Sequence, residues 1–270
     1  MTYDSVIIGG GPAAVSAALT LRARNKTVAI ISGGVDDIPL SRAHTIANYP
    51  GMPMISGRDM LLQMEAQADQ AGAEFIRGRA TSVLNMGDSF GVAVGQDFYM
   101  CRTVILCTGM KAGNAFPGEK ELLGRGVSYC VTCDGMLYRG KDVCLAGFTS
   151  DTMEEAALLR DMGCRVEVFT DKKSRYVIEG EERVTALQVG EKRYPCEAVF
   201  ILRSGVAPDA LLEGLRLNGP HIETDEGRRT NLPGVFAAGD CTGAPYQVAK
   251  AVGDGNIAAL SAAKYLEENK

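Results

Sequence analysis

The first part of the chain shows a change of hydrophobic periodicity that predicts three elements. Residues 6–8 are an uninterrupted apolar run, and small and apolar residues then recur at helical spacing through Ala14, Ala17 and Leu21. A second apolar run follows at 27–31. We therefore expect a buried strand, a helix and a second strand, the repeating element of parallel sheets that are covered by helices.

The same pattern occurs again later in the chain. Residues 144–147 align with residues 6–9, an offset of 138 positions, and Leu159 aligns with Leu21 without a gap. Two strand-helix-strand patterns at a fixed offset predict two units of common design. The chain is therefore expected to contain two Rossmann-like units.

The remaining periodic segments complete the predicted elements. Ser56 followed by Asp59 is typical of a helix N-cap, and the next apolar positions are expected to face inward, at Met60, Leu61, Met64 and Ala68. Short strands typical of a β-meander are predicted at 81–84, 90–94, 97–101 and 103–107. The last predicted element is a helix over 246–265, with core positions at Val248, Val252, Ile257 and Leu260.

Composition and charge narrow the class of protein. The 270 residues are 46% hydrophobic and 23% charged, which is typical of a globular protein whose core needs no disulfide or metal. A net charge of −5 argues against nucleic acid or an anionic membrane as a partner. No apolar run reaches the ~18 residues of a membrane span. Because no signal-peptide pattern precedes the first strand, we expect a cytoplasmic protein with mainly reduced cysteines.

The turn after the first strand carries a dinucleotide fingerprint. Residues 9–14, GGGPAA, fit the pattern G-x-G-x-x-A between a predicted strand and a predicted helix. In this pattern Gly9 allows the tight turn, Gly11 lets the backbone approach a pyrophosphate, and Ala14 permits close packing of helix and strand. The alternative is a tight turn that binds nothing. The second strand ends at Ser32, where the acid that usually binds a ribose is missing.

The second copy is altered at the positions that would touch a nucleotide. Gly147 is retained, but Thr149 and Thr152 replace the second glycine and the small residue, and Phe148 fills the position between. A threonine side chain obstructs the approach of backbone to a pyrophosphate. We therefore expect that the scaffold is kept and nucleotide binding is lost.

A cysteine pair lies ahead of the first strand of the second copy. Cys130 and Cys133 form a C-x-x-C pattern, which can bind zinc, carry redox chemistry or be inert. Zinc needs about four ligands, and the other six cysteines and the two histidines are solitary, so no metal site is expected. A redox dithiol is favoured, because C-x-x-C at a helix start brings two sulfurs together and lowers one thiol's pKa. Asp134 could exchange the proton. The other cysteines are predicted core residues, with a redox role left open for Cys241.

These motifs in combination resemble the low-molecular-weight thioredoxin reductases. The resemblance covers nearly the whole chain and rests on GGGPAA at 9–14, NYPG at 48–51, CTG at 107–109, CVTCDG at 130–135, GVFAAGD at 234–240 and PYQVAKAVGDGNIAAL at 245–260. It implies an α/β fold of two Rossmann-like domains. The first, over 1–109 and 206–270, would be an FAD-binding domain with a β-meander insertion. The second, over 110–205, would be a shortened NADPH-type domain that carries the dithiol.

The resemblance also implies a cofactor site, a reaction and partners. FAD would be held by Gly9, Gly11, Pro12, Ala13, Ala14, Asn48, Thr108, Gly109, Gly239, Asp240, Gln247 and Val248. Cys133 would face the flavin and Cys130 would attack a disulfide of thioredoxin or a thioredoxin-like protein, with Asp134 as acid and base. Members of this family are homodimers.

The chain departs from this family in its second copy. Typical members bind NADPH there through a second G-x-G-x-x-A and a later basic run, but here that run reads TDKK at 170–173, and Asp171 would repel a 2′-phosphate. The stretch 171–198 is also too short for the usual domain. A subset of the family that lacks these motifs takes electrons from reduced ferredoxin, and this sequence resembles that subset.

Two questions stay open at this point. A basic surface for acidic ferredoxin, or only a solvated charged face, could be formed by Lys172, Lys173, Arg175, Lys192 and Arg193. The alternative donors to ferredoxin are a nicotinamide cofactor bound in an unusual mode and a second flavin in the vacated site. The alternative direction of the reaction is that of a disulfide oxidase. A flavin-binding scaffold or redox sensor is the non-enzymatic alternative.

Overall fold

The computed structural model describes residues 2–109, 115–129, 131–149, 151–203 and 208–269. The chain divides into two compact units, which are described one at a time. Unit 1 comprises Met1–Lys111 and Gly205–Lys270, and unit 2 comprises Ala112–Ser204.

Unit 1 is built on one mixed sheet. Its strands are β1 (Thr2–Ile8), β2 (Val28–Ser32), β3 (Glu74–Arg77), β4 (Ala80–Asn85), β5 (Phe90–Val94), β6 (Asp97–Leu106) and β16 (Val235–Ala237). They lie in the order β3-β2-β1-β6-β5-β4, and β16 pairs with β6. β1, β2, β3, β6 and β16 run parallel, whereas β4, β5 and β6 form the antiparallel meander. The predicted class of fold, parallel α/β with an inserted β-meander, is confirmed.

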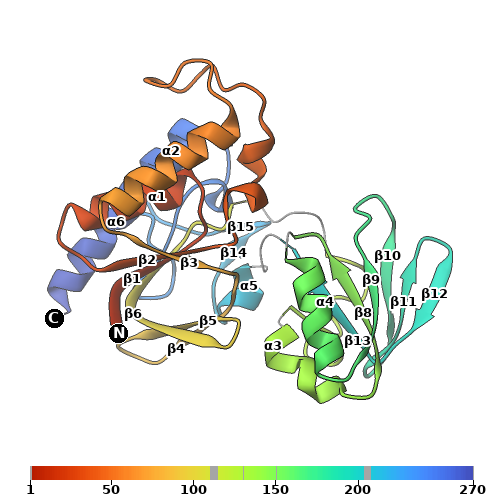
Figure 1. Ribbon diagram of the computed structural model, residues 1–270. Coiled ribbons are helices and arrows are strands. Elements are labelled where there is room, and N and C mark those ends of the chain that lie inside the picture. Colours follow the sequence, from red (N-terminus) through yellow and green to blue (C-terminus); the bar gives the residue numbers. More distant parts are fainter. Residues whose placement is uncertain (1, 110–114, 130, 150, 204–207, 270) are drawn as a thin grey trace. The chain divides into compact units, whose positions relative to one another are not determined.

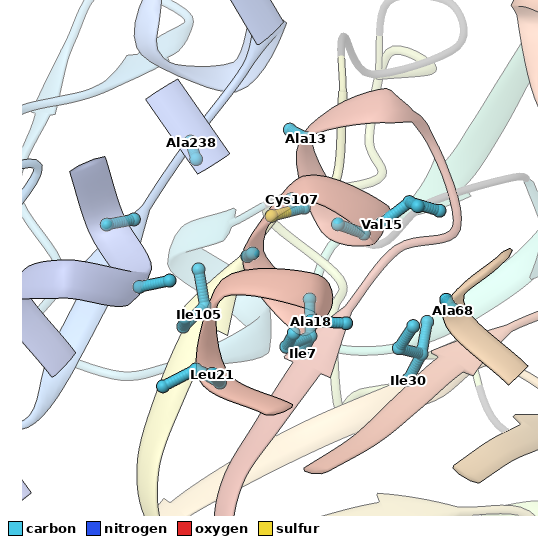
Figure 2. Packing of buried hydrophobic residues seen from close by; sticks show 14 of the residues in the cluster. Ile7, Ala13, Val15, Ala18, Leu21, Ile30, Ala68, Ile105, Cys107 and Ala238 are labelled. Carbon is cyan, nitrogen blue, oxygen red and sulfur yellow. The ribbon is translucent and has the colours of Figure 1, made fainter. Parts of the chain in front are cut away.

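Three helices cover one face of this sheet (Figure 1). They are α1 (Pro12–Arg22), α2 (Gly57–Gln70) and α6 (Val248–Glu268). Figure 2 shows Ala18 and Leu21 of α1 lying over Ile7 and Ile105 of the sheet. The alternate strand residues, such as Val6 and Ile8, point to the other face and pack with the meander. The short elements of this unit are α5 (Pro208–Leu211), β14 (Leu217–Asn218) and β15 (His221–Ile222).

Unit 2 has a parallel sheet between a helical layer and a small antiparallel sheet. The parallel strands lie in the order β7 (Val127–Ser128), β13 (Ala198–Leu202), β8 (Asp142–Gly147) and β9 (Arg165–Phe169). α3 (Val131–Asp134) and α4 (Thr152–Asp161) pack on one face. The antiparallel sheet on the other face comprises β10 (Tyr176–Gly180), β11 (Val184–Val189) and β12 (Lys192–Pro195) (Figure 1).

Two local predictions were wrong. The strands expected at 97–101 and 103–107 are one strand, β6, which pairs with β5 along its first half and with β16 along its second. Ile257 and Leu260, expected in the core, are 37% and 39% exposed. α6 instead faces α1 with small residues such as Ala258 and Ala262, which allow the two helices to approach closely. Within the described residues, no helix combines the length and apolar character that a membrane crossing needs.

Candidate functional site

The first glycine turn lies at the carboxyl end of β1. Gly9 has φ of +121°, and a Cβ there would lie 2.1 Å from the carbonyl oxygen of Cys107, so no side chain fits. A Cβ on Gly10 would lie 2.3 Å from the hydroxyl oxygen of Ser32. At Gly11, by contrast, no described atom beyond the two neighbouring residues lies within 4 Å of a built Cβ, and φ is an ordinary −78°. The fold therefore explains the first two glycines, while the third faces open space.

The amino end of α1 lies beside this open space. Gly11 is the N-cap residue, and among the described residues no side chain caps the helix. Pro12 follows it, and the first turn holds no acidic residue. The uncapped backbone N–H groups and the helix dipole make such an end a site for an anion. This is the local chemistry that a dinucleotide pyrophosphate requires.

The carboxyl end of β16 and helix α6 both lie against the amino end of α1. Gly239 has φ of +86°, and a Cβ there would lie 3.0 Å from the Cβ of Ala13. A Cβ on Gly255 would lie 2.1 Å from the carbonyl oxygen of Ala13. These close approaches place Asp240 near the amino end of α1, at the carboxyl ends of neighbouring parallel strands. Ligands of open α/β sheets bind at this kind of edge.

A buried ionic network holds the loop that contains Asp240. The Lys250 ammonium donates hydrogen bonds to the carbonyl oxygens of Gly239 (2.8 Å) and Gly243 (2.7 Å). It also pairs with the Asp254 carboxylate at 2.9 Å, which Arg228 contacts at 2.6 Å from another segment. Burial raises the pKa of Asp240, Lys250 opposes this rise, and Asp254 adds to it. Lys250 and Arg228 were not predicted from the sequence, in which the one signal was a lysine in the first turn of the last helix.

Asn48 and Gln247 come together from distant parts of unit 1. The Asn48 Nδ2 donates to Gln247 Oε1 at 2.8 Å, and both residues are exposed. Gln247 is the N-cap of α6, which Val248 begins. Two residues that the resemblance assigned to the flavin side are therefore adjacent.

The CTG segment follows β6 at the same edge. The Cys107 N–H donates to Ile8 O at 2.8 Å, so the chain after β6 runs beside the glycine turn that follows β1. Gly109, two residues later, has φ of +64°. The Thr108 hydroxyl is buried. Cys241 packs beneath, and its thiol donates to Leu106 O at 3.3 Å. Burial raises the pKa of Cys241 to about 11, so this thiol has the character of a core residue.

The residues at this edge could together hold FAD. The open space over Gly11 and the uncapped end of α1 fit a pyrophosphate. The carboxylate of Asp240 fits a ribityl hydroxyl, and the amino end of α6 at Val248 offers further backbone donors. The residues that the resemblance assigned to FAD all belong to unit 1: Gly9, Gly11, Pro12, Ala13, Ala14, Asn48, Thr108, Gly109, Gly239, Asp240, Gln247 and Val248.

The dithiol segment belongs to unit 2. Cys130 and the side chain of Cys133 lie outside the described residues, while the backbone of Cys133 is part of α3. The Asp134 carboxylate accepts a hydrogen bond of 2.6 Å from the hydroxyl of buried Ser128, at the end of β7. This hydrogen bond holds the side chain of Asp134, the residue that follows Cys133 in the chain. Next to it, Met136 and Leu137 are 55% and 68% exposed.

The second glycine turn is closed by its own side chains. A Cβ on Gly147 would lie 2.1 Å from the methyl group of Thr152. The Thr152 hydroxyl accepts from the Thr149 N–H (3.3 Å) and donates to the Thr149 carbonyl (2.8 Å), and the Thr149 hydroxyl donates to Asp151 Oδ1 (2.6 Å). Phe148 packs edge-on against Phe116 and Tyr176. The Thr149 N–H and both threonine hydroxyls are therefore bonded within the turn.

Unit 2 also contains a buried ion pair that the sequence analysis missed. Arg203 follows β13 and Glu119 lies 84 positions earlier, and their side chains are 6% and 0% exposed. An arginine directly after an apolar strand was the one available signal. No cluster of three or more His, Cys, Asp or Glu side chains suited to a metal occurs among the described residues.

Comparison with known proteins agrees with the two-unit architecture. A family model for pyridine nucleotide-disulphide oxidoreductases matches residues 3–174 and 166–255. The thioredoxin reductase of Listeria monocytogenes is 33% identical, over 99% of this chain and 95% of that protein. A solved ferredoxin-flavin thioredoxin reductase from Clostridium acetobutylicum is 35% identical, with a TM-score of 0.91 over 99% of this chain and 98% of that one. A thioredoxin reductase from Gloeobacter violaceus is 30% identical, with a TM-score of 0.85 over 100% and 95%.

These similarities extend over nearly the full length of both partners in each comparison. They include the glycine turn of unit 1 and the C-x-x-C segment of unit 2, so the likeness is not confined to one nucleotide-binding motif. The chain belongs to the low-molecular-weight thioredoxin reductases, a family of FAD-binding disulfide oxidoreductases.

Proposed function

We propose that this protein reduces thioredoxin or a thioredoxin-like protein with electrons from reduced ferredoxin rather than from NADPH. The observation that carries this proposal is the altered second glycine turn, where Thr149 and Thr152 bond each other and Phe148 packs against Phe116. In this proposal residues 1–109 and 206–270 form the FAD-binding domain, and residues 110–205 form the reduced domain with the dithiol.

FAD would occupy the edge of unit 1 described above. Gly9 and Gly11 would let the backbone approach the pyrophosphate, and Asp240 would bind the ribityl chain. Gln247, fixed by Asn48, would present the amino end of α6 to the flavin ring. When bound, FAD supplies a carrier that accepts electrons singly and passes them on in pairs.

The dithiol would transfer these electrons by thiol-disulfide exchange. Two electrons and two protons convert the Cys130–Cys133 disulfide to two thiols. The Cys130 thiolate then attacks one sulfur of the partner's disulfide, which releases one partner thiolate and forms a mixed disulfide. Cys133 attacks the Cys130 sulfur, releases the second partner thiolate and restores the disulfide. Asp134, held by Ser128, would exchange the proton with the thiol.

In unit 2, one exposed apolar surface supports a protein partner, and one acidic side chain argues against NADPH. Exposed Met136 and Leu137, directly after the dithiol segment, offer apolar contacts to a protein disulfide substrate. Asp171 accepts hydrogen bonds from the Lys173 N–H and the Ser174 hydroxyl, which lower its pKa and keep it anionic. A negative charge at this position disfavours a nucleotide 2′-phosphate.

Ferredoxin is proposed as donor because the chain resembles a ferredoxin-flavin thioredoxin reductase over almost its whole length. Lys172, Lys173, Arg175, Lys192 and Arg193 would attract an acidic protein. Part of this charge is compensated, since Arg193 pairs with Glu179 at 2.7 Å. We also propose a homodimer, for which exposed Ile257 and Leu260 of α6 offer apolar surface; its mass by light scattering tests this part.

The proposal is tested by anaerobic flavin absorbance with NADPH, NADH and reduced ferredoxin in separate samples. We expect ferredoxin alone to bleach the flavin rapidly, and the bleached enzyme to reduce thioredoxin. Cys130→Ser should keep flavin bleaching and lose thioredoxin reduction. Cys164→Ser is the matched control, because its thiol is buried and bonds Tyr138 O, and it should retain both. Rapid bleaching by NADPH would contradict the proposed donor, and a protein that cannot be loaded with FAD would contradict the proposed flavoenzyme.

A further inference from the structure

Glu119 and Arg203 form a charged pair inside unit 2. Arg203 Nη1 lies 2.7 Å from Glu119 Oε1, and Nη2 lies 2.8 Å from Oε2, so the contact is bidentate. Desolvation of two charges is costly, and an apolar pair of similar size would stabilise a fold as well or better. A buried pair of this kind is therefore weak evidence for added stability, and the groups it contacts show which geometry it imposes here.

The Glu119 carboxylate also binds the segment that leads into the dithiol. It accepts a hydrogen bond from the Tyr129 hydroxyl at 3.0 Å and one from the Phe116 N–H at 2.7 Å. Tyr129 directly precedes Cys130 in the chain. Burial by itself raises the pKa of Glu119, but the hydrogen bonds and charge of Arg203, with those two donors, bring the pKa below its ordinary value. The group that Tyr129 contacts is thus a carboxylate at neutral pH.

The strand pairing explains how these groups meet. β7 lies beside β13, with Val127 opposite Val199 and Ser128 opposite Phe200. The two strands are parallel, so the residues that follow them, Tyr129 and Arg203, leave the sheet at the same edge. Glu119 lies between them and contacts both.

The same network reaches the altered glycine turn. The Arg203 guanidinium lies 4.1 Å from the ring centroid of Phe116. Phe116 stacks on Tyr176 at 4.8 Å and meets Phe148, in the altered turn, edge-on at 6.2 Å. Phe116 thus links the ion pair to Tyr176 and to the altered turn at Phe148.

We propose that Glu119 and Arg203 are positioning residues for the redox dithiol. They hold the side chain of Tyr129, the residue that precedes Cys130 in the chain, through its hydroxyl. Ser128 and Asp134 hold the other side of the segment. This inference rests on the proposed function, in which Cys130 is the attacking thiol.

The test uses the full-length protein loaded with FAD and needs neither ferredoxin nor thioredoxin. After chemical reduction, the alkylation rate of Cys130 by iodoacetamide is followed against pH by peptide mass spectrometry. The dithiol-disulfide equilibrium constant is measured in glutathione buffers. Tyr129→Phe removes only the hydroxyl, and should change both quantities by about threefold or more, because a hydrogen bond to a charged group is lost.

Tyr3→Phe is the matched control. The Tyr3 hydroxyl donates to the Glu74 carboxylate at 2.6 Å, so this variant removes the same kind of hydrogen bond. Tyr3 lies in unit 1 and is distant in sequence from the dithiol segment of unit 2. It should leave both quantities within twofold. The double variant E119Q/R203M replaces the charged pair by a neutral one and should shift both quantities in the direction of Tyr129→Phe. A merely structural role would lower thermal stability without moving the pH profile of alkylation.

Two results would overturn the inference and point to different causes. If Tyr129→Phe behaves like Tyr3→Phe while wild-type Cys130 and Cys133 exchange with glutathione, the network does not position the dithiol and the proposed function stands. If the wild-type cysteines form no disulfide in any glutathione buffer, the proposed function fails, and this inference fails with it.

Discussion

Asn48 and Gln247 lie 199 positions apart and are joined by a hydrogen bond of 2.8 Å between their side-chain amides. Gln247 is the N-cap of α6, and Asn48 lies in the long connection between β2 and α2. The bond therefore fixes a loop from the first half of the chain against the last helix. In the proposed function, this contact orders the flavin side of the site.

Removal of this contact should weaken flavin binding. Asn48→Ala deletes one side-chain hydrogen bond, worth about 1 kcal/mol, so FAD affinity should fall about fivefold. FAD fluorescence during dialysis or titration measures it. Asn256→Ala is the control, because its amide joins α6 to Thr20 of α1 at 2.8 Å, and FAD affinity should not change. Equal losses in both variants would contradict a local role for Asn48.

The two glycines of the first turn should respond differently to substitution. In Gly11→Thr the new side chain would extend into open space, and the N-cap conformation of this position suits threonine. The stability of the FAD-free protein should therefore be retained. FAD affinity should fall about tenfold or more, because the side chain occupies the place of the pyrophosphate. Titration with FAD and thermal unfolding of the FAD-free protein separate the effects. Unchanged flavin occupancy would refute the explanation given for the altered turn of unit 2.

Gly9→Ala should instead damage the fold itself. Its Cβ would lie 2.1 Å from the Cys107 carbonyl oxygen, at φ of +121°. We expect a loss of about 3 kcal/mol in the free energy of unfolding, from overlap and backbone strain. Urea unfolding of the FAD-free protein measures this loss, and stability equal to that of Gly11→Thr would contradict it.

Asp254 should be essential to the stability of unit 1. Asp254→Ala would leave Lys250 and Arg228 without their shared carboxylate, and the free energy of unfolding should fall by about 3 kcal/mol. Asp225→Asn is the comparison, since the Asp225–Arg229 pair is exposed and should contribute less than about 1 kcal/mol. Urea unfolding followed by circular dichroism distinguishes the two values. A small loss at Asp254 would show that solvent compensates the two cations.

The six described cysteines should resist alkylation in the folded protein. Burial raises the pKa of Cys101 to about 12 and that of Cys241 to about 11. Burial also raises the pKa of Cys107 and Cys164, and the bond to Cys196 and burial raise that of Cys144. Because the thiolate is the reactive form, iodoacetamide at pH 8 should leave these five unmodified. The hydrogen bond with Cys144 lowers the pKa of Cys196, so this sixth thiol is protected only by its burial, which leaves 4% of the residue exposed.

The pH dependence of this protection has a defined direction. A raised pKa in the fold favours the neutral thiol, so its contribution to stability is complete below the unfolded value of about 8.5. That contribution is lost as the pH rises toward 11 and 12 for Cys241 and Cys101. Peptide mass spectrometry across this range should show alkylation that begins only when the protein unfolds. Modification of Cys241 at pH 8 would reopen a redox role for it.

The sequence predicted those features that depend on neighbours along the chain. The strand-helix-strand periodicity defined β1, α1 and β2, and its repeat defined β8, α4 and β9. The Ser56 cap was also predicted: its hydroxyl accepts from the Asp59 N–H at 3.1 Å. These features follow from local periodicity and backbone hydrogen bonding, which a single stretch of sequence carries.

The sequence predicted less well where partners are distant. β6 was divided in two because its neighbours change from β5 to β16, and no local signal records that it continues. Ile257 and Leu260 were assigned to the core by their hydrophobicity. Contact between α6 and α1 instead selects small residues, since Gly255 must pass the backbone of Ala13.

The chain by itself determined that there are two Rossmann-like units, that the first has an intact glycine turn and that the second has an altered one. Only the tertiary structure decided what the altered turn does, because its threonines bond one another while Phe148 meets Phe116 and Tyr176. It likewise decided that Glu119 contacts Arg203 across 84 positions. Side chains that compensate a buried charge are selected by proximity in space, and periodicity along the chain carries no trace of that proximity.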